Sequence, residues 1–199
     1  VKIKNIMTVC ILGNSLTALT LAKALVNYEI DVDVISNKKN YKINDSRTIG
    51  ISKNNVDFFN SNIINIDKLI WNIKKIEIFS ENLKGEKLIN FKADKNQLFS
   101  IIKNYKLLQL LEKYLSKSKF FRSKFLTMEN LSFLNKYELV INCDPFNFIT
   151  KRYFSKKISK EYNSTAYTTI ISHDEIINDT AVQIFTKKGP LAFLPISNK

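Results

Sequence analysis

The sequence predicts an α/β fold in which a parallel sheet is interleaved with an antiparallel sheet. Three apolar runs rich in β-forming residues, at 5–12, 30–35 and 138–143, are typical of strands buried on both faces of a parallel sheet. Two regions, 71–91 and 164–196, instead alternate apolar and polar residues, as strands with one exposed face do. This order predicts an α/β layer with a second sheet inserted and then continued.

The N-terminal elements form a β–turn–α–β unit, the standard start of a parallel sheet. A turn at 13–15 follows the strand over 5–12, and the second strand covers 30–35. Between them, apolar residues recur at the spacing of one helix face: Leu16, Leu19, Ala22, Leu25 and Val26.

The remaining elements are predicted from the same two periods. Helices are expected over 52–63 and over 96–115, the strongest helical pattern of the chain. Strands are expected at 71–79, 88–91, 120–125, 131–133, 138–143 and 164–172, and 181–185 is expected to pair with 191–196 through 186–190.

The charge of the chain does not indicate a nucleic-acid partner. Of 31 basic residues only three are Arg, and the lysines are spread along all 199 residues rather than gathered in one segment. The net charge of +13 favours a mild attraction to anionic membrane surfaces instead. With 45% hydrophobic residues the chain can bury a core.

The chain lacks the residues of a disulfide framework, a cysteine-built zinc site or a multi-histidine metal site. It holds one His and two Cys, Cys10 and Cys143, both in apolar segments, so we expect reduced, buried thiols in a cytoplasmic protein. No apolar run approaches the ~20 residues of a membrane-spanning helix. The apolar start after Lys2 and Lys4 also has features of a signal peptide, but the turn at 13–15 favours a buried strand.

The turn after the first strand resembles the dinucleotide-binding pattern G-x-G-x-x-G. It reads Gly13-Asn14-Ser15-Leu16-Thr17-Ala18. Gly13 matches, Ala18 is an accepted third residue, and Ser15 departs because its Cβ would crowd a pyrophosphate, although its hydroxyl can donate. The helix that starts there would offer free N–H groups to an anion. The pattern alone is equally compatible with a strand–turn–helix that binds nothing.

The acidic residue that would bind a ribose is missing at the end of the second strand. Ser36 and Asn37 stand there, and Ser36 can make one neutral hydrogen bond. Asp33 has about the expected ~20-residue spacing from Gly13, but it lies inside the strand and is not predicted to bind.

Three further segments resemble the flavin-dependent aromatic hydroxylases of ubiquinone biosynthesis. Residues 45–52, Asp-Ser-Arg-Thr-Ile-Gly-Ile-Ser, resemble their Asp-Gly-Arg-Ser-x-Ala-Leu-Ser segment. Residues 185–195, Phe-Thr-Lys-Lys-Gly-Pro-Leu-Ala-Phe-Leu-Pro, resemble their Phe-Thr-x-x-Gly-Pro-Leu-Ala-Leu-Leu-Pro signature. Residues 98–111 are similar to their long helix, with Asn104 at its characteristic Asn. The order and spacing match across nearly the whole chain.

The resemblance implies an FAD/NAD(P)-binding, Rossmann-like parallel sheet of the para-hydroxybenzoate hydroxylase type, with an incomplete substrate-domain sheet. The FAD-binding part would comprise 1–70 and 96–155, and the substrate sheet 71–95 and 156–199. Among the cofactor-binding residues, Gly13, Ser15 and Ala18 would contact the pyrophosphate and Ser36 the ribose. Arg47 would lie near the phosphates or the reductant, Asn104 near the flavin, and Asp144 would accept a hydrogen bond. Leu194 and Pro195 would line the pocket that binds the substrate ring. The family's Gly after this Asp is Pro145 here, which is a departure from its pattern at the position that relates cofactor and reductant.

The chemistry implied is hydroxylation of the aromatic ring of a polyprenyl phenol, with no catalytic side chain required. Electrons would come from NAD(P)H, and reduced FAD would take up O2 as a C4a-hydroperoxide. A membrane-bound phenol fits a protein at the inner face of the cytoplasmic membrane, and a ubiquinone-biosynthesis complex is a further partner to expect. Two alternatives stay open: a degenerate, non-catalytic flavoprotein relative acting as a binding or assembly subunit, and a basic nucleic-acid-binding domain.

The length departs from the family. Its members are about twice as long, and their second FAD motif, Gly-Asp followed by Ala-His, would lie beyond Lys199. We therefore expect the chain to correspond to the N-terminal half, as a fragment or a split protein. We also expect it to be inactive and to bind FAD weakly or not at all on its own.

Overall fold

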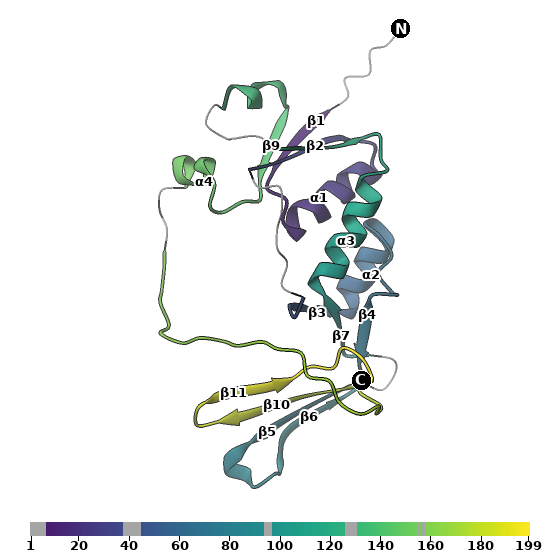
Figure 1. Cartoon of the computed structure of the whole chain (residues 1–199), viewed down its shortest axis with the longest axis vertical. Helices are drawn as coiled ribbons and strands as arrows, with labels where there is room; N and C mark the ends of the chain where they lie inside the picture. Colours follow the sequence, from purple (N-terminus) through teal and green to yellow (C-terminus); the bar gives the residue numbers. More distant parts are fainter. Residues whose placement is uncertain (1–6, 38–44, 94–96, 126–130, 155, 157) are drawn as a thin grey trace. The chain divides into compact units, whose positions relative to one another are not determined.

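The computed structural model describes residues 7–37, 45–93, 97–125, 131–154, 156 and 158–199. The first residues of the strand expected over 5–12 and of the helix expected over 96–115 lie outside these ranges. The chain divides into two compact units (Figure 1). Unit 1 comprises Val1–Ile43, Asn62–Ile64 and Leu108–Tyr167, and unit 2 comprises Asn44–Ser61, Asn65–Leu107 and Thr168–Lys199.

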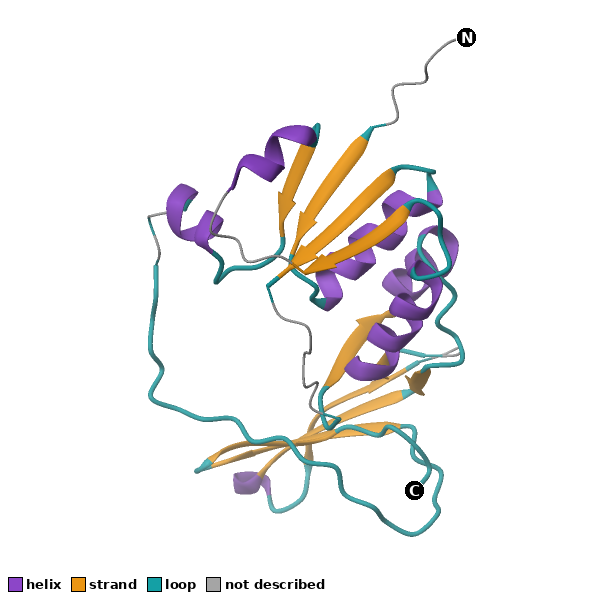
Figure 2. Ribbon diagram, turned by 45° about the horizontal axis from the view of Figure 1, so that its top comes forward, coloured by secondary structure: helices purple, strands orange, loops and turns teal. Residues whose placement is uncertain are grey.

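Unit 1 contains a four-stranded sheet in which every neighbouring pair is parallel (Figure 2). Its strands are β1 (Thr8–Leu12), β2 (Asp31–Ser36), β8 (Phe121–Phe125) and β9 (Leu139–Asn142), in the order β8-β2-β1-β9. The three expected parallel strands are thus confirmed, and the strand expected over 120–125 becomes the fourth. The central strand β1 is buried along Val9–Leu12, as expected for a strand covered on both faces.

Helices cover the two faces of this sheet. The helix α1 (Leu16–Asn27) packs on β1 and β2 through a buried face that includes Ala18, Ala22 and Val26. The other face of the sheet, which carries Cys10 and Ile35, meets η2 (Leu131–Lys136) and α4 (Phe148–Tyr153). The short strand expected over 131–133 is wrong, because a 3-10 turn there brings the adjacent side chains of Phe133 and Leu134 onto one cluster, whereas a strand would separate them.

Unit 2 contains a three-stranded antiparallel sheet in the order β3-β7-β4. The strands are β3 (Thr48–Ser52), β7 (Phe99–Lys103) and β4 (Ile70–Ile73), and α2 (Lys53–Asn62) follows β3 directly, which confirms the helix expected over 52–63. The single helix expected over 96–115 is wrong in its first part. Residues 99–103 form the central strand β7, and α3 (Asn104–Leu115) begins only after it.

The second sheet of unit 2 is built from two antiparallel hairpins. Its strands are β5 (Lys75–Ser80), β6 (Lys87–Lys92), β10 (Thr180–Thr186) and β11 (Gly189–Phe193), in the order β11-β10-β5-β6 with η1 (Glu81–Leu83) between β5 and β6. The hairpins β5–β6 and β10–β11 confirm two expected strand pairs, and β10 joins them by pairing parallel to β5.

Two expectations in this region are wrong. The strand expected over 71–79 is divided between β4 and β5, which belong to different sheets. The strand expected over 164–172 does not form, and its residues are exposed without a pairing partner among the described residues. Alternation of apolar and polar residues does not by itself supply the partner that a strand needs.

Candidate functional site

The strand order of unit 1 places a switch point between β1 and β9. From β1 the chain moves outward to β2 and β8, and then returns to the other side of β1 as β9. In open parallel sheets, ligands bind outside the carboxyl ends of the strands at such a point. The two strands that flank it end at Leu12 and Asn142, so Gly13 and Asp144 follow them at the same edge of the sheet.

Gly13 is held close against Asp144. Its φ of +106° lies in the region that favours glycine, and its N–H donates to the carbonyl of Ile35 at 2.8 Å. A Cβ at this position would lie 3.2 Å from the Cβ of Asp144. The tight turn therefore requires a glycine for both its backbone conformation and its packing.

Ser15 begins α1 as its N-cap. Its Oγ accepts a hydrogen bond from the N–H of Ala18 at 3.4 Å, and the first turn of α1 holds no acidic residue. The remaining N–H groups of this turn have no partner within the helix, so the turn presents donors and a positive dipole end. Ala18 is fully buried, which explains the need for a small residue at the third position of the pattern.

A hydrogen-bonded network that was not predicted holds the Asp144 loop. The carboxylate Oδ1 of Asp144 accepts from the N–H of Phe146 at 2.9 Å, and the carbonyl of Asp144 accepts from Thr150 Oγ1 at 2.8 Å. Asn147 caps α4 by accepting from the N–H of Thr150 at 2.9 Å, and its Nδ2 donates to Asn142 Oδ1 at 2.7 Å. The Asn-x-x-Thr spacing is the sequence signal for this cap.

The end of β2 differs from the expectation for a ribose-binding residue. Ser36 is only 4% exposed, and the exposed Asn37 follows it. A ribose-binding role for Ser36 stays a prediction.

Asp33 forms an ion cluster inside unit 1, away from the end of β2. It is 3% exposed and accepts hydrogen bonds from Arg122 Nε at 2.6 Å, Lys124 Nζ at 2.5 Å and Tyr137 Oη at 2.5 Å. Burial alone would raise the pKa of Asp33, but the bonds from Lys124, Tyr137 and Arg122 together hold it below its ordinary value. The cluster explains why Asp33 cannot serve a ribose.

The charge of Asp33 also affects its neighbours. Burial, followed by the hydrogen bond to this carboxylate, raises the pKa of Tyr137. Burial and the carboxylate together raise the pKa of Cys10 to about 12, so the thiol stays protonated at neutral pH. Cys10 and Cys143 are both free thiols; Cys10 is buried as expected, whereas Cys143 is only half-buried.

The other predicted site residues belong to unit 2. Asn104 and Arg47 are neighbours, because the N–H of Asn104 donates to the carbonyl of Arg47 at 3.0 Å where β3 and β7 meet. The side chain of Arg47 is exposed. At the end of the signature segment, Leu194 is 49% exposed whereas Pro195 is buried, so only Leu194 offers an apolar surface.

The described residues hold no group of three His, Cys, Asp or Glu side chains that could bind a metal ion. None of the helices within them is both long and apolar enough to cross a bilayer.

The sequence matches no protein-family model and no curated protein. The structure, however, is similar to solved flavoprotein monooxygenases. It resembles PqsL from Pseudomonas aeruginosa, a probable FAD-dependent monooxygenase, with a TM-score of 0.58 and 12% identity over 78% of this chain and 48% of that chain. It also resembles p-nitrophenol 4-monooxygenase PnpA from Pseudomonas putida DLL-E4, with a TM-score of 0.50 and 13% identity over 60% of this chain and 32% of that chain.

These similarities establish the fold. The parallel sheet with separate antiparallel sheets is the arrangement of FAD-binding flavoprotein monooxygenases, as the sequence predicted. The chain spans about half or less of the length of these two proteins.

Proposed function

We propose that the chain is part of an FAD-dependent monooxygenase that hydroxylates the ring of a polyprenyl phenol in ubiquinone biosynthesis, with NAD(P)H as reductant. The observation that carries the FAD site is the contact of Gly13 with Asp144 at the switch point of the parallel sheet. The polyprenyl substrate rests on the resemblance of residues 45–52 and 185–195 to the ubiquinone hydroxylases.

The residues at the switch point fit the pyrophosphate of a dinucleotide. The turn at Gly13 has no side chain, and the first N–H groups of α1 follow it directly. Ser15 adds a hydroxyl donor, and the network around Asn147 holds the Asp144 loop beside them. Bound FAD would supply the electron transfer and oxygen activation that no side chain provides.

The substrate side requires an apolar, water-excluding surface rather than a catalytic residue. The sheet β11-β10-β5-β6 supplies such a surface, because Leu191 and Phe193 share one face of β11 and are 49% and 46% exposed. A phenol ring with a polyprenyl tail would bury this surface, and its water-insoluble tail would keep the protein near the membrane.

A second candidate function is a non-catalytic flavoprotein relative that acts as a binding or assembly subunit. It is favoured by Ser15, whose Cβ stands where the pattern has its second glycine, and by Pro145, which removes the N–H that follows Asp144. Both residues would weaken the contact with a cofactor without disturbing the fold.

Titration of FAD into the chain, followed by flavin fluorescence anisotropy, tests the site. We expect weak, saturable binding that Gly13→Val abolishes, because the new side chain would fill the space beside Asp144. The control Gly85→Val places the same side chain at another positive-φ glycine, which has no atom within 4 Å of its Cβ position and lies in unit 2. Equal binding by the wild type and Gly13→Val, with both folded by circular dichroism, would overturn the site.

Activity separates the two candidate functions. Oxidation of NADH or NADPH by the FAD-loaded chain that consumes O2 and increases with an added phenol would support the monooxygenase. Because the chain is expected to be inactive by itself, FAD binding would support the non-catalytic relative only if no such oxidation appears when the remaining part of a monooxygenase is also supplied.

A further inference from the structure

An extended stretch of chain, residues 164–172, belongs to none of the sheets that the described residues form. It reads Ser-Thr-Ala-Tyr-Thr-Thr-Ile-Ile-Ser, and every one of its residues is exposed. The side chains of Tyr167 and Ile171 are 91% and 64% exposed. A run of exposed apolar side chains of this kind is typical of a surface that another molecule covers.

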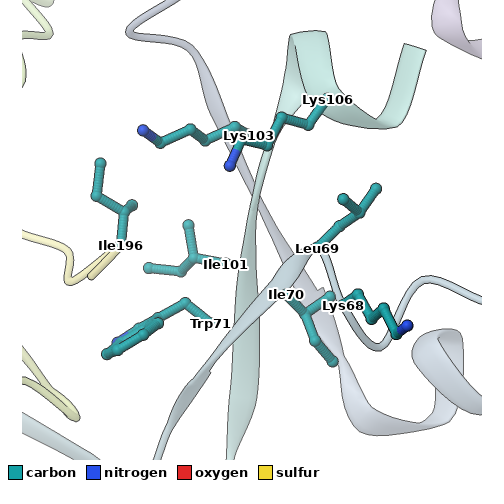
Figure 3. Close-up of a pocket in the computed structure, with 8 residues that line it drawn as sticks. All are labelled: Lys68, Leu69, Ile70, Trp71, Ile101, Lys103, Lys106 and Ile196. Atoms are coloured by element: carbon teal, nitrogen blue, oxygen red, sulfur yellow. The ribbon is translucent and has the colours of Figure 1, made fainter. Parts of the chain in front are cut away.

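A position outside the sheets does not by itself leave a residue exposed. Ile196 follows the last strand rather than belonging to one, yet it is half-buried and packs against a core cluster that includes Ile101. It lies beside Trp71 and Ile101 where these residues and Lys103 line a pocket of about 150 Å³ (Figure 3). Residues 164–172 differ, because no described part of the chain covers them.

The stretch has the composition of a β-strand. Six of its nine residues are Thr, Tyr or Ile, which favour strands, and none is charged, Pro or Gly. Asn163, with a φ of +49°, bends the backbone just before it. Residues 164–172 are therefore able to pair with another strand along their whole length, and they only lack the partner.

The charges on the two sides of the stretch have opposite sign. Residues 156–161 hold three lysines and one glutamate, whereas residues 173–177 hold Asp174 and Glu175 and no Lys or Arg. Glu175 also pairs with Lys199 at 3.1 Å, but both side chains are largely exposed and such a pair contributes little. Two copies in antiparallel alignment would bring the basic side of each beside the acidic side of the other, whereas parallel copies would bring like charges together. The charges therefore favour a second copy in the antiparallel orientation.

We propose that residues 164–172 pair with the same residues of a second copy, as two antiparallel strands centred on Thr168. This register pairs all nine residues, and any shift pairs fewer. It places each Tyr167 opposite Thr169 of the other copy and diagonal to its Ile171, on one face of the strand pair. The interface has two-fold symmetry and closes as a dimer. The inference rests on this stretch alone and stands whether or not the chain is a monooxygenase.

Sedimentation velocity over a wide range of protein concentrations at low salt tests the association. We expect a monomer–dimer equilibrium in the wild type and dimerisation at least tenfold weaker in Thr168→Pro, because a proline at the centre interrupts the ladder of backbone hydrogen bonds. The matched control is Ser159→Pro, at an exposed position outside the stretch, which should dimerise like the wild type. Circular dichroism checks the fold of each variant.

Cysteine cross-linking tests the register. The background variant Cys143→Ser removes the half-buried thiol. In this background, Thr168→Cys should form an intermolecular disulfide on mild oxidation, because each residue 168 faces its own counterpart at a Cα distance of about 4.5–5.5 Å. Ser164→Cys faces Ser172 instead, so its two thiols would lie about 26 Å apart along the strands and should cross-link at least tenfold more slowly.

Charge reversal tests the orientation. Asp174→Lys with Glu175→Lys makes both sides of the stretch basic, so we expect dimerisation to weaken at least tenfold at low salt. Adding Lys156→Glu and Lys160→Glu to this double variant exchanges the two signs and should restore the dimer. A merely structural effect of the first two substitutions would not be reversed by the second two.

Four outcomes would overturn the proposal. A wild type that stays monomeric at every concentration would mean that the stretch is unpaired or pairs within its own chain. A Thr168→Pro variant that dimerises like the wild type would place the contact elsewhere. Equal cross-linking rates for Thr168→Cys and Ser164→Cys would indicate parallel or unspecific contact, and an unrestored dimer after the charge exchange would remove the reason for the antiparallel orientation.

Discussion

Two separate features of the structure, the backbone conformation and the close packing against Asp144, favour a glycine at position 13. Its φ of +106° is strained for any residue with a side chain, and the space for a Cβ is taken by Asp144 at 3.2 Å. We therefore expect Gly13→Ala to lower the free energy of unfolding by about 1–3 kcal/mol. Urea denaturation followed by circular dichroism measures this change.

Two other glycines separate the contributions of strain and crowding. Gly85 has a φ of +92°, but no atom lies within 4 Å of the position of an added Cβ. Gly85→Ala should therefore lower the free energy of unfolding by about 1 kcal/mol, through backbone strain alone. Gly50 has no positive φ and its nearest neighbour would be 3.7 Å away, so Gly50→Ala should change stability by no more than about 0.5 kcal/mol. A loss in Gly13→Ala no larger than that in Gly85→Ala would contradict the close contact with Asp144.

The Asp33 cluster predicts a pH dependence of stability. Because the pKa of Asp33 is lowered in the folded state, its contribution is fully present above the unfolded value of about 3.9 and is lost as the pH falls through the folded value. Asp33→Asn should cost about 1–3 kcal/mol at neutral pH, since it removes the negative charge and one of the two oxygens that accept from Arg122, Lys124 and Tyr137.

The measurement is the difference in unfolding free energy between wild type and Asp33→Asn at several pH values. We expect the difference to be constant from neutral pH down to about pH 5 and to shrink as the carboxylate is protonated below that. The matched control is Asp31→Asn, whose carboxylate contacts only Arg122, at 3.1 Å, among the residues that the structure describes. A difference that does not vary with pH would contradict the ionised state of Asp33.

At the scale of elements, the short helix α4 positions the Asp144 loop. Asn147 is 4% exposed, caps α4 and donates to Asn142, so Asn147→Ala removes the cap and the shorter of the two hydrogen bonds that Asn142 Oδ1 accepts, the other coming from the N–H of Asp144. We expect a loss of about 1–2 kcal/mol in urea denaturation. Asn147→Asp keeps the oxygen that caps Thr150 and should lose less. An equal loss in the two variants would mean that the bond to Asn142, rather than the cap, stabilises this loop.

The elements also show how far periodicity alone predicts the fold. The helix α1 was predicted correctly because its apolar residues recur at helical spacing, and the buried strands β1, β2 and β9 because they are short apolar runs rich in β-forming residues. The region before Asn104 was not, because Leu98, Ile101 and Ile102 fit a helical stripe and a buried strand equally well. Residues 99–103 form a strand because they pair with β3 on one side and with β4 on the other.

At the scale of the whole molecule, the net charge of +13 predicts an electrostatic attraction to anionic bilayers. Each lysine near the surface contributes about 1 kcal/mol to such binding, and salt screens it. In co-sedimentation, we expect the chain to bind vesicles that contain anionic phosphatidylglycerol at low salt and to be released at high salt.

Vesicles of neutral phosphatidylcholine are the control and should not bind the chain. Duplex DNA gives a second comparison, because its phosphates offer a higher density of negative charge. Tighter, salt-dependent binding to DNA than to the anionic vesicles would favour a nucleic-acid partner and contradict the membrane interpretation.

The sequence by itself determined the fold class and the residues of the turn at Gly13, because local patterns specify strands, helices and tight turns. It also placed Asp144 after a buried strand. Only the tertiary structure brought Gly13 and Asp144 into contact, enclosed Asp33 among residues 89 to 104 positions away, and joined Trp71 and Lys103 in one pocket. These contacts depend on which strands become neighbours, and strand pairing is a property of the whole chain that no local pattern encodes.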